Sequence, residues 1–341
     1  MSVLRDAMNT LPLLCLVTPA LADANNGNWQ TAQRWARLLS THYRVRLAKT
    51  WTGASATDRA DQGLLALHAR RSADAVAAWA RQRPGQPLVL ALTGTDLYRD
   101  IQSDARAQRS IRLASALIVL QELGPLALPA DLRERCHVVL QSSTRRKALA
   151  KTSAHLRALM VGHLREEKSP ETLFEAARLL QPGEGIRLDH IGRALDPALA
   201  RAAEATMVDC PHYRWLGGLP HNTTRQRIQR AHLLVHASRL EGGAHVIMEA
   251  ALSGTPVLAS RIDGNVGMLG GDYAGYFEPG DAQGLARLLR ICRRGIAQPD
   301  GFLAQLHSQC DQRARLFEPA AEQAALLRAL AGLPWSAGPP R

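Results

Sequence analysis

The sequence predicts an α/β protein with two doubly wound domains, each a parallel sheet covered by helices. Short runs of Leu, Val and Ile, typical of strands buried on both faces, alternate with longer amphipathic segments. Polar or glycine-containing loops follow several of these runs, as expected at the carboxyl edge of such a sheet. A chain of 341 residues is also long enough for two domains of ordinary size.

The first half opens with an apolar run, residues 13–18, that reads as a buried strand. The polar loop 25–28 and an amphipathic helix over 29–40 complete the first strand–loop–helix unit. A secretory signal peptide is the alternative, because Arg5 precedes the apolar stretch 11–17 and Ala20-Leu21-Ala22 follows it. We favour the strand, since the run is short, begins at Leu11-Pro12 and supplies an element that the fold needs.

The remaining elements of the first half follow the same alternation. Ser72 is expected to cap a helix that ends near Gln82. The strand over 87–92 delivers residues 93–96 to the same sheet edge as the loop 25–28. The other strands are expected at residues 43–49, 64–68, 114–120 and 137–141.

A polar stretch, residues 141–154, separates the two halves and is the predicted linker. We place the first domain at 1–150, the second at 151–332 and a flexible tail at 333–341. In the second half, Ser169 and Pro170 are expected to start a helix. The strands of this half are expected at residues 156–161, 186–191, 213–216, 233–236, 257–259 and near 276–277, and the helices at 170–180, 198–205, 225–229, 282–291 and 320–331.

Composition and charge limit the classes of function that the chain can have. The formal charge is +12, but the basic residues are mostly arginines spread through helical segments, so we expect no nucleic-acid binding and instead a field that attracts anionic substrates. The five cysteines are isolated and read as reduced thiols of a cytoplasmic protein, with a catalytic thiol as the less favoured alternative. No stretch is apolar enough to span a bilayer, so stable membrane insertion is not expected.

Residues 238–260 carry the strongest candidate site. Glu241 and Glu249 bracket a glycine pair, and an apolar helical run then leads through Gly254-Thr255-Pro256 to a strand. Glycines at a helix start allow close approach of a ligand, and the unpaired N–H groups there favour a phosphate. Carboxylates near this seat can accept hydrogen bonds from the hydroxyls of a sugar or ribose.

This pattern resembles the donor site of nucleotide-sugar glycosyltransferases of the GT-B fold, of the family 4 type. Residues 93–100, 241–246 and 264–267 resemble, more narrowly, the selenosugar synthases of selenoneine biosynthesis. The resemblance implies two Rossmann-like domains that face each other across a cleft. It also implies transfer of a sugar from a UDP-sugar, UDP-N-acetylglucosamine above all, to selenophosphate, with pathway partners that supply selenophosphate and consume the selenosugar.

The same resemblance implies roles for residues of the second half. Lys168 and Arg165 would stabilise the departing diphosphate, Glu241 would meet the sugar hydroxyls, and Glu249 would hold the ribose. His163 stands where the family usually has an arginine, which weakens the assignment of Arg165. The other donor-binding residues implied are Gly217, Gly243, Ala244, His245, Val246, Gly264 and Asn265, the last two in a second glycine loop over 264–267.

A small anionic acceptor needs hydrogen-bond donors more than a long groove. The candidates on the first half are Asn25, Asn26, Gly27, Asn28, Thr93, Thr95 and Arg99. We expect no metal and no cofactor, because the chain lacks an Asp-x-Asp motif. His232 and His236 are spaced by four but belong to a strand rather than to a metal site.

Two other functions stay open at this point. An ordinary GT-B glycosyltransferase that acts on a cell-envelope glycan or lipid would carry the same donor signature. A nucleotide-sugar-binding regulator without turnover is the third hypothesis, and retention of both glutamates and Lys168 argues against it.

Overall fold

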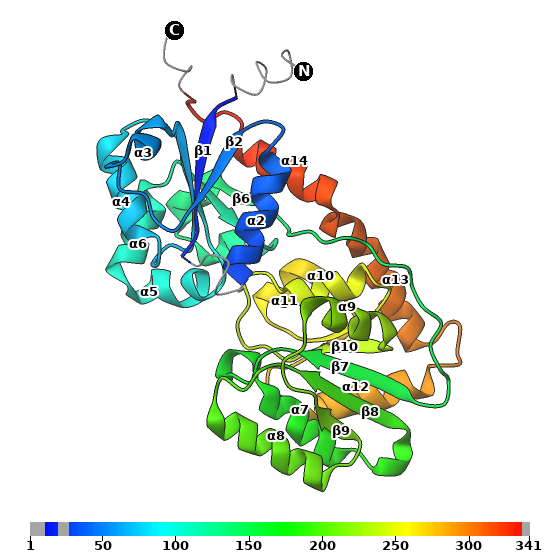
Figure 1. The fold of residues 1–341 in the computed structure, drawn as a ribbon. Coiled ribbons are helices and arrows are strands. Elements are labelled where there is room, and N and C mark those ends of the chain that lie inside the picture. The colour runs from blue at the N-terminus through cyan, green and yellow to red at the C-terminus, as the bar shows by residue number, and fades with distance from the viewer. Residues whose placement is uncertain (1–10, 20–26, 336–341) are drawn as a thin grey trace. The chain divides into compact units, whose positions relative to one another are not determined.

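The computed structural model describes residues 11–19 and 27–335. The chain divides into two compact units. Unit 1 comprises residues 1–141 together with 319–341, and unit 2 comprises residues 142–318. Each unit has its own six-stranded sheet, which confirms the predicted two-domain α/β class (Figure 1).

The sheet of unit 1 is parallel throughout, with strand order β2-β1-β3-β4-β5-β6. Residues 14–17 are fully buried, which explains why none of these four residues is charged or strongly polar. The run is therefore a strand, as predicted. The strands are β1 (Leu13–Val17), β2 (Arg44–Ala48), β3 (Gly63–Leu67), β4 (Leu88–Ala91), β5 (Ala116–Val119) and β6 (Cys136–Val138).

Helices cover both faces of this sheet. The longer ones are α2 (Gly27–Leu39), α4 (Ala73–Gln82), α6 (Ala105–Leu113) and α14 (Pro319–Leu330). Helices α2 and α14 form one core with the sheet, and α4 and α6 form the other (Figure 1). Short turns complete the connections: α3 (Ala56–Ala60), the π-helical turn η2 (Asp96–Asp100), α5 (Ile101–Ser103), and the 3-10 turns η3 (Gly124–Ala127) and η4 (Ala130–Arg135).

The last helix shifts the domain boundaries away from the predicted ones. We expected the second domain to continue to residue 332, but α14 packs on unit 1. Leu326 is fully buried in that core, and the fully buried Glu322 accepts a hydrogen bond of 2.6 Å from Trp35 Nε1. Contacts between such distant segments leave no local sign in the sequence. The first boundary also falls after Gln141 rather than at residue 150.

The start of the expected tail is packed. Leu333 and Trp335 lie against the core of unit 1, and the Trp335 ring lies 4.8 Å from the Tyr43 ring. A Cβ at Gly63 would come within 2.4 Å of the Trp335 ring, so the small residue makes room for the indole. Residues 336–341 lie outside the described residues.

Unit 2 repeats the architecture, with strand order β12-β11-β10-β7-β8-β9 and parallel pairing. All six expected strands are present, which confirms this part of the prediction. They are β7 (Leu156–Val161), β8 (Ile186–Ile191), β9 (Tyr213–Trp215), β10 (Leu233–His236), β11 (Val257–Ser260) and β12 (Tyr276–Phe277).

Helices lie on both faces of the second sheet (Figure 1). Those on one face are α7 (Pro170–Leu179), α8 (Pro197–Asp209) and α12 (Ala282–Arg294), and those on the other are α9 (His221–Arg230), α10 (His245–Ala251), α11 (Asp263–Leu269) and α13 (Phe302–Ala314). Three 3-10 turns also occur in this unit: η5 (Glu166–Lys168), η6 (Pro182–Glu184) and η7 (Arg315–Phe317). The expected glycine loop 264–267 is wrong, because these residues lie inside α11.

Each sheet has one topological switch point, where successive strands turn to opposite sides of the first. It lies between β1 and β3 in unit 1 and between β7 and β10 in unit 2. Ligands of open parallel sheets bind outside the carboxyl ends of the strands at such points. The loops after these four strands are therefore where a site is expected.

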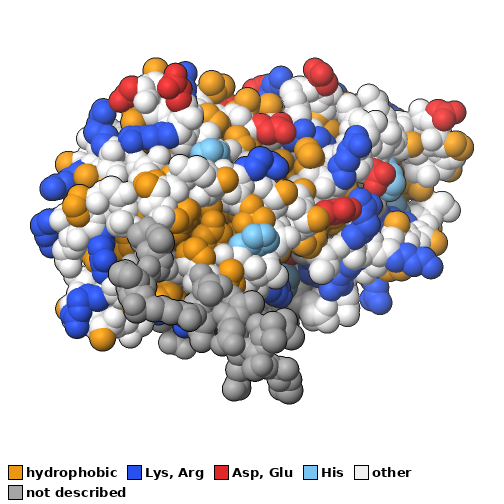
Figure 2. Space-filling view, turned by 90° about the horizontal axis from the view of Figure 1, so that it is seen from above, with side chains coloured by type: hydrophobic (Ala, Val, Ile, Leu, Met, Phe, Trp, Pro, Cys, Tyr) orange, Lys and Arg blue, Asp and Glu red, His pale blue; other side chains and the backbone are white. Residues whose placement is uncertain are grey.

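Two observations bear on the surface. Lys and Arg side chains are scattered in small groups over the face shown in Figure 2, between acidic and apolar side chains. On this face the basic side chains do not form one continuous patch. In the described part of the chain, no helix combines the length and apolar character that crossing a membrane requires.

Candidate functional site

Two loops meet at the switch point of unit 2. One follows β7 and contains η5. The other follows β10 and carries Glu241, Gly242 and Gly243, here called the glutamate-glycine segment. The Arg239 N–H donates a hydrogen bond of 2.9 Å to the Glu167 carbonyl, which joins the loops through their backbones. Segments about seventy residues apart in the sequence thus form one surface at the sheet edge.

Lys168 and Glu241 form an ion pair across this junction. Lys168 Nζ lies 2.5 Å from Glu241 Oε1, with side-chain exposures of 17% and 11%. His236, at the carboxyl end of β10 and 2% exposed, places Nε2 3.2 Å from the same oxygen. The structure brings the two principal predicted residues together and adds His236, which no sequence pattern had placed at the site.

The charges of this cluster determine its protonation. Burial opposes ionisation of Glu241, but Lys168 and His236 outweigh that effect and hold the pKa of Glu241 well below its usual range. Burial lowers the pKa of His236 despite the neighbouring carboxylate. These shifts favour the ionised carboxylate at Glu241 and the uncharged imidazole at His236.

The turn that presents Lys168 is conformationally restricted. Ser169 has φ 46° and ψ 54°, in the left-handed region that residues other than glycine seldom adopt, and it is 1% exposed. It occupies the N-cap position of α7 as predicted, but its side chain makes no capping hydrogen bond. Its Oγ instead contacts Thr172 Oγ1 at 3.0 Å and accepts from Arg239 Nε at 3.3 Å. Ser169 thus holds both loops in place.

Positive charge gathers beside this turn. Burial lowers the pKa of His163, and the cations of Arg165, Arg193 and Lys168 lower it further. Arg165 is exposed, with its nearest carboxylate oxygen, Glu167 Oε2, 3.9 Å away. Arg193 follows β8. No motif around it and no spacing from other residues indicated in the sequence that it belongs to the site. Such a group of cations favours a polyanionic ligand.

Glu249 has a separate environment on α10. It is 4% exposed, and its Oε1 lies 2.7 Å from His221 Nε2 and 3.7 Å from Arg225 Nη1. The hydrogen bond to Glu249 raises the pKa of His221 above its ordinary value, although burial acts against this. Both partners belong to α9, and no sequence pattern marked them because only the fold brings α9 next to α10.

A backbone N–H group next to the glutamate-glycine segment donates a hydrogen bond within the protein. Ala244 N–H, expected to bind a diphosphate, donates to Met268 Sδ at 3.0 Å. His245 is the first residue of α10 rather than a loop residue, and both it and Val246 are half-buried. Gly243 precedes them and is also half-buried. The structure thus keeps these residues at the site but alters the expected role of Ala244.

Helix α11 supports the loop from behind. A Cβ at Gly264 would come within 2.2 Å of the Glu241 carbonyl oxygen, so only glycine allows this contact. Asn265 is fully buried, and its Nδ2 donates to the Ser260 carbonyl at 2.9 Å. Ser260 Oγ in turn donates to the Ser238 carbonyl at 2.5 Å. Asn265 therefore positions the loop through Ser260.

Gly217, the remaining donor-site prediction, follows β9. Its φ of +66° lies in the region that favours glycine, and no atom lies within 4 Å of a Cβ built on it. Its carbonyl accepts a hydrogen bond of 2.9 Å from Gly192 N–H. The residue thus lies at the same carboxyl edge of the sheet, with open space beside it.

The predicted acceptor residues of unit 1 are largely engaged with neighbouring groups. Asp96, fully buried, accepts from Thr93 N–H at 2.8 Å and from Gly94 N–H at 3.0 Å. Thr95 Oγ1 lies 3.4 Å from His68 Nε2. Residues 93–96 therefore form a turn around the Asp96 carboxylate.

The other acceptor candidates lie in two places. Arg99 is exposed and pairs with Asp100 at 3.4 Å. Gly27 and Asn28 form the first turn of α2, where the Gly27 carbonyl accepts from Thr31 Oγ1 at 2.8 Å. Asn25 and Asn26 lie outside the described residues.

No metal-binding group of three His, Cys, Asp or Glu side chains occurs within the described ranges, 11–19 and 27–335.

Comparison with known proteins identifies the fold. Residues 141–292, almost all in unit 2, match the family of glycosyl transferases group 1. No curated protein matches the chain. The matched domain and the fold together support a GT-B glycosyltransferase.

Three solved structures illustrate the likeness. Sucrose-phosphate synthase from Thermosynechococcus elongatus is 16% identical, with a TM-score of 0.71 over 94% of this chain and 98% of that one. HepE from Anabaena, in complex with UDP and glucose, is 16% identical, with a TM-score of 0.68 over 95% and 100%. TarM from S. aureus is 13% identical, with a TM-score of 0.63 over 79% of this chain, which spans only 55% of the TarM chain. At such identities the likeness establishes the GT-B fold.

Proposed function

We propose that the protein is a metal-independent glycosyltransferase of the selenosugar synthase type, whose donor is a UDP-sugar and whose acceptor is selenophosphate. The observation that carries the donor half of this proposal is the Lys168–Glu241 pair at the switch point of unit 2. The acceptor half depends on the resemblance of residues 93–100, 241–246 and 264–267 to the selenosugar synthases.

The donor assignment has further support from structural neighbours. HepE has been solved with UDP and with UDP-glucose, and a TarM mutant with UDP and α-GlcNAc-glycerol. These complexes favour a UDP-sugar for the present chain, and we propose UDP-N-acetylglucosamine. The cations beside η5 suit the diphosphate, and the buried Glu249 suits the ribose hydroxyls.

In the proposed reaction the anomeric carbon of the sugar loses its bond to UDP and gains a bond to selenium. The C1–O bond to UDP breaks with its electron pair remaining on UDP, and a selenium lone pair forms the C1–Se bond. Water then attacks phosphorus and the Se–P bond breaks. The hydroxyl stays on phosphorus to give phosphate, selenium retains the electron pair, and the remaining proton is released. The products are a 1-seleno-sugar, UDP and phosphate.

Lys168 would stabilise the charge that develops on the β-phosphate as UDP leaves. Fixed donors in a site that excludes water serve this purpose without a metal ion. Glu241 would hold Lys168 in position and accept hydrogen bonds from the sugar hydroxyls. Lys168 is one of four lysines in a chain rich in arginine, which fits a requirement for a compact ammonium.

A product assay tests the proposal. The purified protein is incubated with selenophosphate and a panel of UDP-sugars, and the products are identified by mass. A seleno-sugar from one donor supports the function. Transfer only to a glycan or lipid acceptor would identify an ordinary GT-B glycosyltransferase, and donor binding without any product would identify a regulator.

A further inference from the structure

A pocket of about 560 Å³ lies at the other switch point, in unit 1. Its lining comes from the carboxyl ends of three adjacent strands: Pro19 after β1, Lys49 and Thr50 after β2, and residues 70–72 after β3. The start of α4 and residues 104 and 106 complete it. The volume lies within the roughly 300–1,000 Å³ typical of small-molecule sites.

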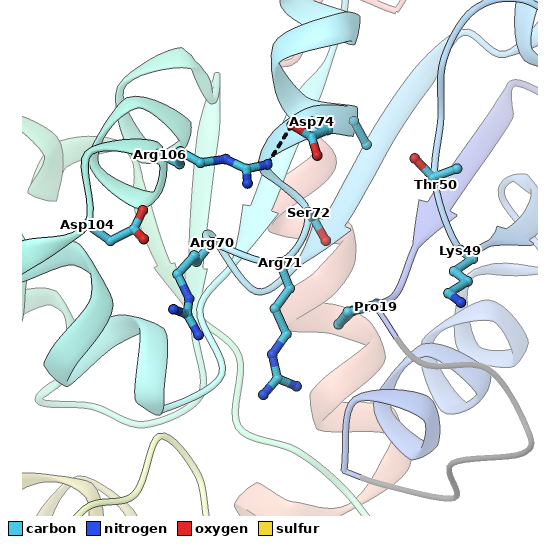
Figure 3. Close-up of a pocket in the computed structure, with 10 residues that line it drawn as sticks. Pro19, Lys49, Thr50, Arg70, Arg71, Ser72, Asp74, Asp104 and Arg106 are labelled. Carbon is cyan, nitrogen blue, oxygen red and sulfur yellow. Dashed lines mark hydrogen bonds and ion pairs between the residues drawn. The ribbon is translucent and has the colours of Figure 1, made fainter.

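The lining is predominantly basic. Four cationic side chains surround the pocket, and Arg70 and Arg71 extend alongside each other into it, with Lys49 beyond Pro19 (Figure 3). The cationic residues are Lys49, Arg70, Arg71 and Arg106, and the acidic ones are Asp74 and Asp104.

Internal pairs neutralise only part of this charge. Arg106 Nη2 pairs with Asp74 at 2.5 Å, and Asp104 accepts from Ala107 N–H as the cap of α6. Arg70 Nε lies 3.2 Å from Asp100 Oδ2. Lys49 and Arg71 are within ion-pair distance of no carboxylate in the described part of the chain. Two cations that share a pocket repel each other unless an anion lies between them.

The loop after β3 is built to present these cations. His68 has φ 73° and is 2% exposed, so a residue other than glycine adopts a left-handed conformation in the core. Its Nδ1 lies 3.8 Å from Asp96 Oδ2, and its Nε2 lies 3.9 Å from Asp100 Oδ2. The Arg71 N–H donates to His68 Nδ1 at 3.4 Å. The bend at His68 thus directs Arg70 and Arg71 into the pocket.

Helix α4 adds to the positive character. Ser72 stands at its N-cap, yet its side chain makes no capping bond, and its Oγ donates to the Leu67 carbonyl at 2.6 Å. The Ser72 side chain therefore caps none of the first-turn N–H groups of α4, of which Ala73 N–H donates to the Arg70 carbonyl at 3.4 Å. This turn lies beside Asp74 and Ala75 of the pocket lining.

We infer that this pocket binds the anionic acceptor and that Lys49 and Arg71 hold its phosphoryl group. The inference extends the proposed function, on which its choice of selenophosphate rests. A guanidinium fork and an ammonium suit the oxygens of a tetrahedral phosphoryl group. The acceptor site would then consist of residues that the sequence analysis did not single out, next to the predicted residues 93–99.

Kinetics with three variants test the inference. In Lys49→Ala and Arg71→Ala, we expect the KM for selenophosphate to rise about ten- to a hundredfold, as for loss of a charge-assisted hydrogen bond. The KM for the UDP-sugar should stay within about twofold. Arg112→Ala is the matched control, because Arg112 is an exposed arginine at the end of α6, paired only with the exposed Asp131 in the described residues, and its loss changes the net charge equally.

A binding experiment separates this inference from the proposed function. Inorganic phosphate is titrated into the full-length protein by calorimetry, and we expect weaker binding in both variants than in Arg112→Ala. If phosphate binding depends on Lys49 and Arg71 but no UDP-sugar gives a seleno-sugar, the pocket stands and the proposed function fails. If a seleno-sugar forms with an unchanged selenophosphate KM in both variants, the function stands and the pocket inference is overturned.

A third arm distinguishes a free anion from a lipid headgroup. Vesicles that carry polyprenyl phosphate are compared with inorganic phosphate as inhibitors of transfer. Inhibition by phosphate that weakens in Arg71→Ala supports the free anion. Inhibition by the vesicles alone would assign the pocket to a lipid phosphate and overturn the inference.

Discussion

Lys168 Nζ and Glu241 Oε1 lie 2.5 Å apart, and both side chains are more than four-fifths buried. The pair joins the loops after β7 and β10, so a residue proposed to stabilise the leaving group is also part of the protein's packing. Removing the cation would strand a carboxylate whose pKa is held low by Lys168 and His236. Effects on turnover and on folding must therefore be separated.

We predict that Lys168→Ala lowers turnover about a hundred- to a thousandfold, as for a lost preorganised donor. It should also lower the free energy of unfolding by about 1 to 3 kcal/mol, less than the roughly 3 to 5 kcal/mol of a fully buried broken pair. Steady-state rates and denaturant unfolding measure the two effects. Near-normal turnover at a saturating donor concentration would exclude Lys168 as the leaving-group cation.

A double variant supplies the control for that prediction. Lys168→Met with Glu241→Gln removes both charges, so stability should recover relative to Lys168→Met alone, while turnover stays low. Recovery of turnover together with stability would mean that Lys168 acts only through folding. Lys168→Arg should recover part of the rate, because a planar fork does not replace a point charge.

The two glutamates are predicted to separate binding from turnover. Glu249, next to His221 and Arg225, is proposed to hold the ribose, so Glu249→Ala should mainly weaken nucleotide-sugar affinity. Glu241→Ala should mainly slow turnover, because its partner is the proposed catalytic cation. Calorimetry with the UDP-sugar and steady-state rates distinguish them. The same change in both quantities for both variants would contradict the assignment.

The sequence allowed prediction of elements whose signal is local. Apolar runs predicted the two parallel sheets, and the glutamate-glycine segment predicted Glu241 at a carboxyl edge. The contacts of Glu241 with His236 and Lys168 depend on the strand order of unit 2, which no local pattern encodes. The return of α14 to unit 1 depends likewise on contacts between distant segments.

Predictions from local sequence patterns were also wrong where tertiary contacts determine the conformation. Residues 264–267 contain two glycines and suggested a loop, but Gly264 is small because α11 packs on the Glu241 backbone. Residues 93–96 suggested free donors, yet Asp96 occupies two of their N–H groups. The basic pocket of unit 1 was not predicted because Lys49 and Arg71 lie in loops after different strands, in a chain rich in arginine.

Activity is predicted to survive chelation by EDTA with little loss. The proposed site stabilises the leaving group with Lys168 and the cations beside η5, which replace a divalent ion. Rates are measured after dialysis against EDTA and again after addition of magnesium or manganese. Loss of activity that either ion restores would contradict the proposal.

The His221–Glu249 hydrogen bond predicts a pH-dependent contribution to stability. The pKa of His221 is raised in the folded state, so its contribution is fully present below the unfolded pKa of about 6.5 and is lost as the pH rises through the folded pKa. Denaturant unfolding of the wild type and His221→Gln should therefore differ more at about pH 5.5 than at about pH 8.5. An equal difference at both pH values would show that the pair carries no proton linkage. Because His221 is 69% exposed, we expect the effect to be small and weakened by salt.

Gly264→Ala is predicted to damage the site through the backbone alone. The new Cβ would come 2.2 Å from the Glu241 carbonyl oxygen. This oxygen belongs to the backbone, so it cannot move aside as the end of a flexible side chain could. Helix α11 or the loop must shift, at a cost of about 1 to 3 kcal/mol for overpacking, and Glu241 would move relative to Lys168. Gly183→Ala is the matched control, because no atom lies within 4 Å of a Cβ at that position. We expect lower unfolding free energy and lower turnover for Gly264→Ala and no change for Gly183→Ala; equal behaviour of the two variants would show that the α11 contact does not position Glu241.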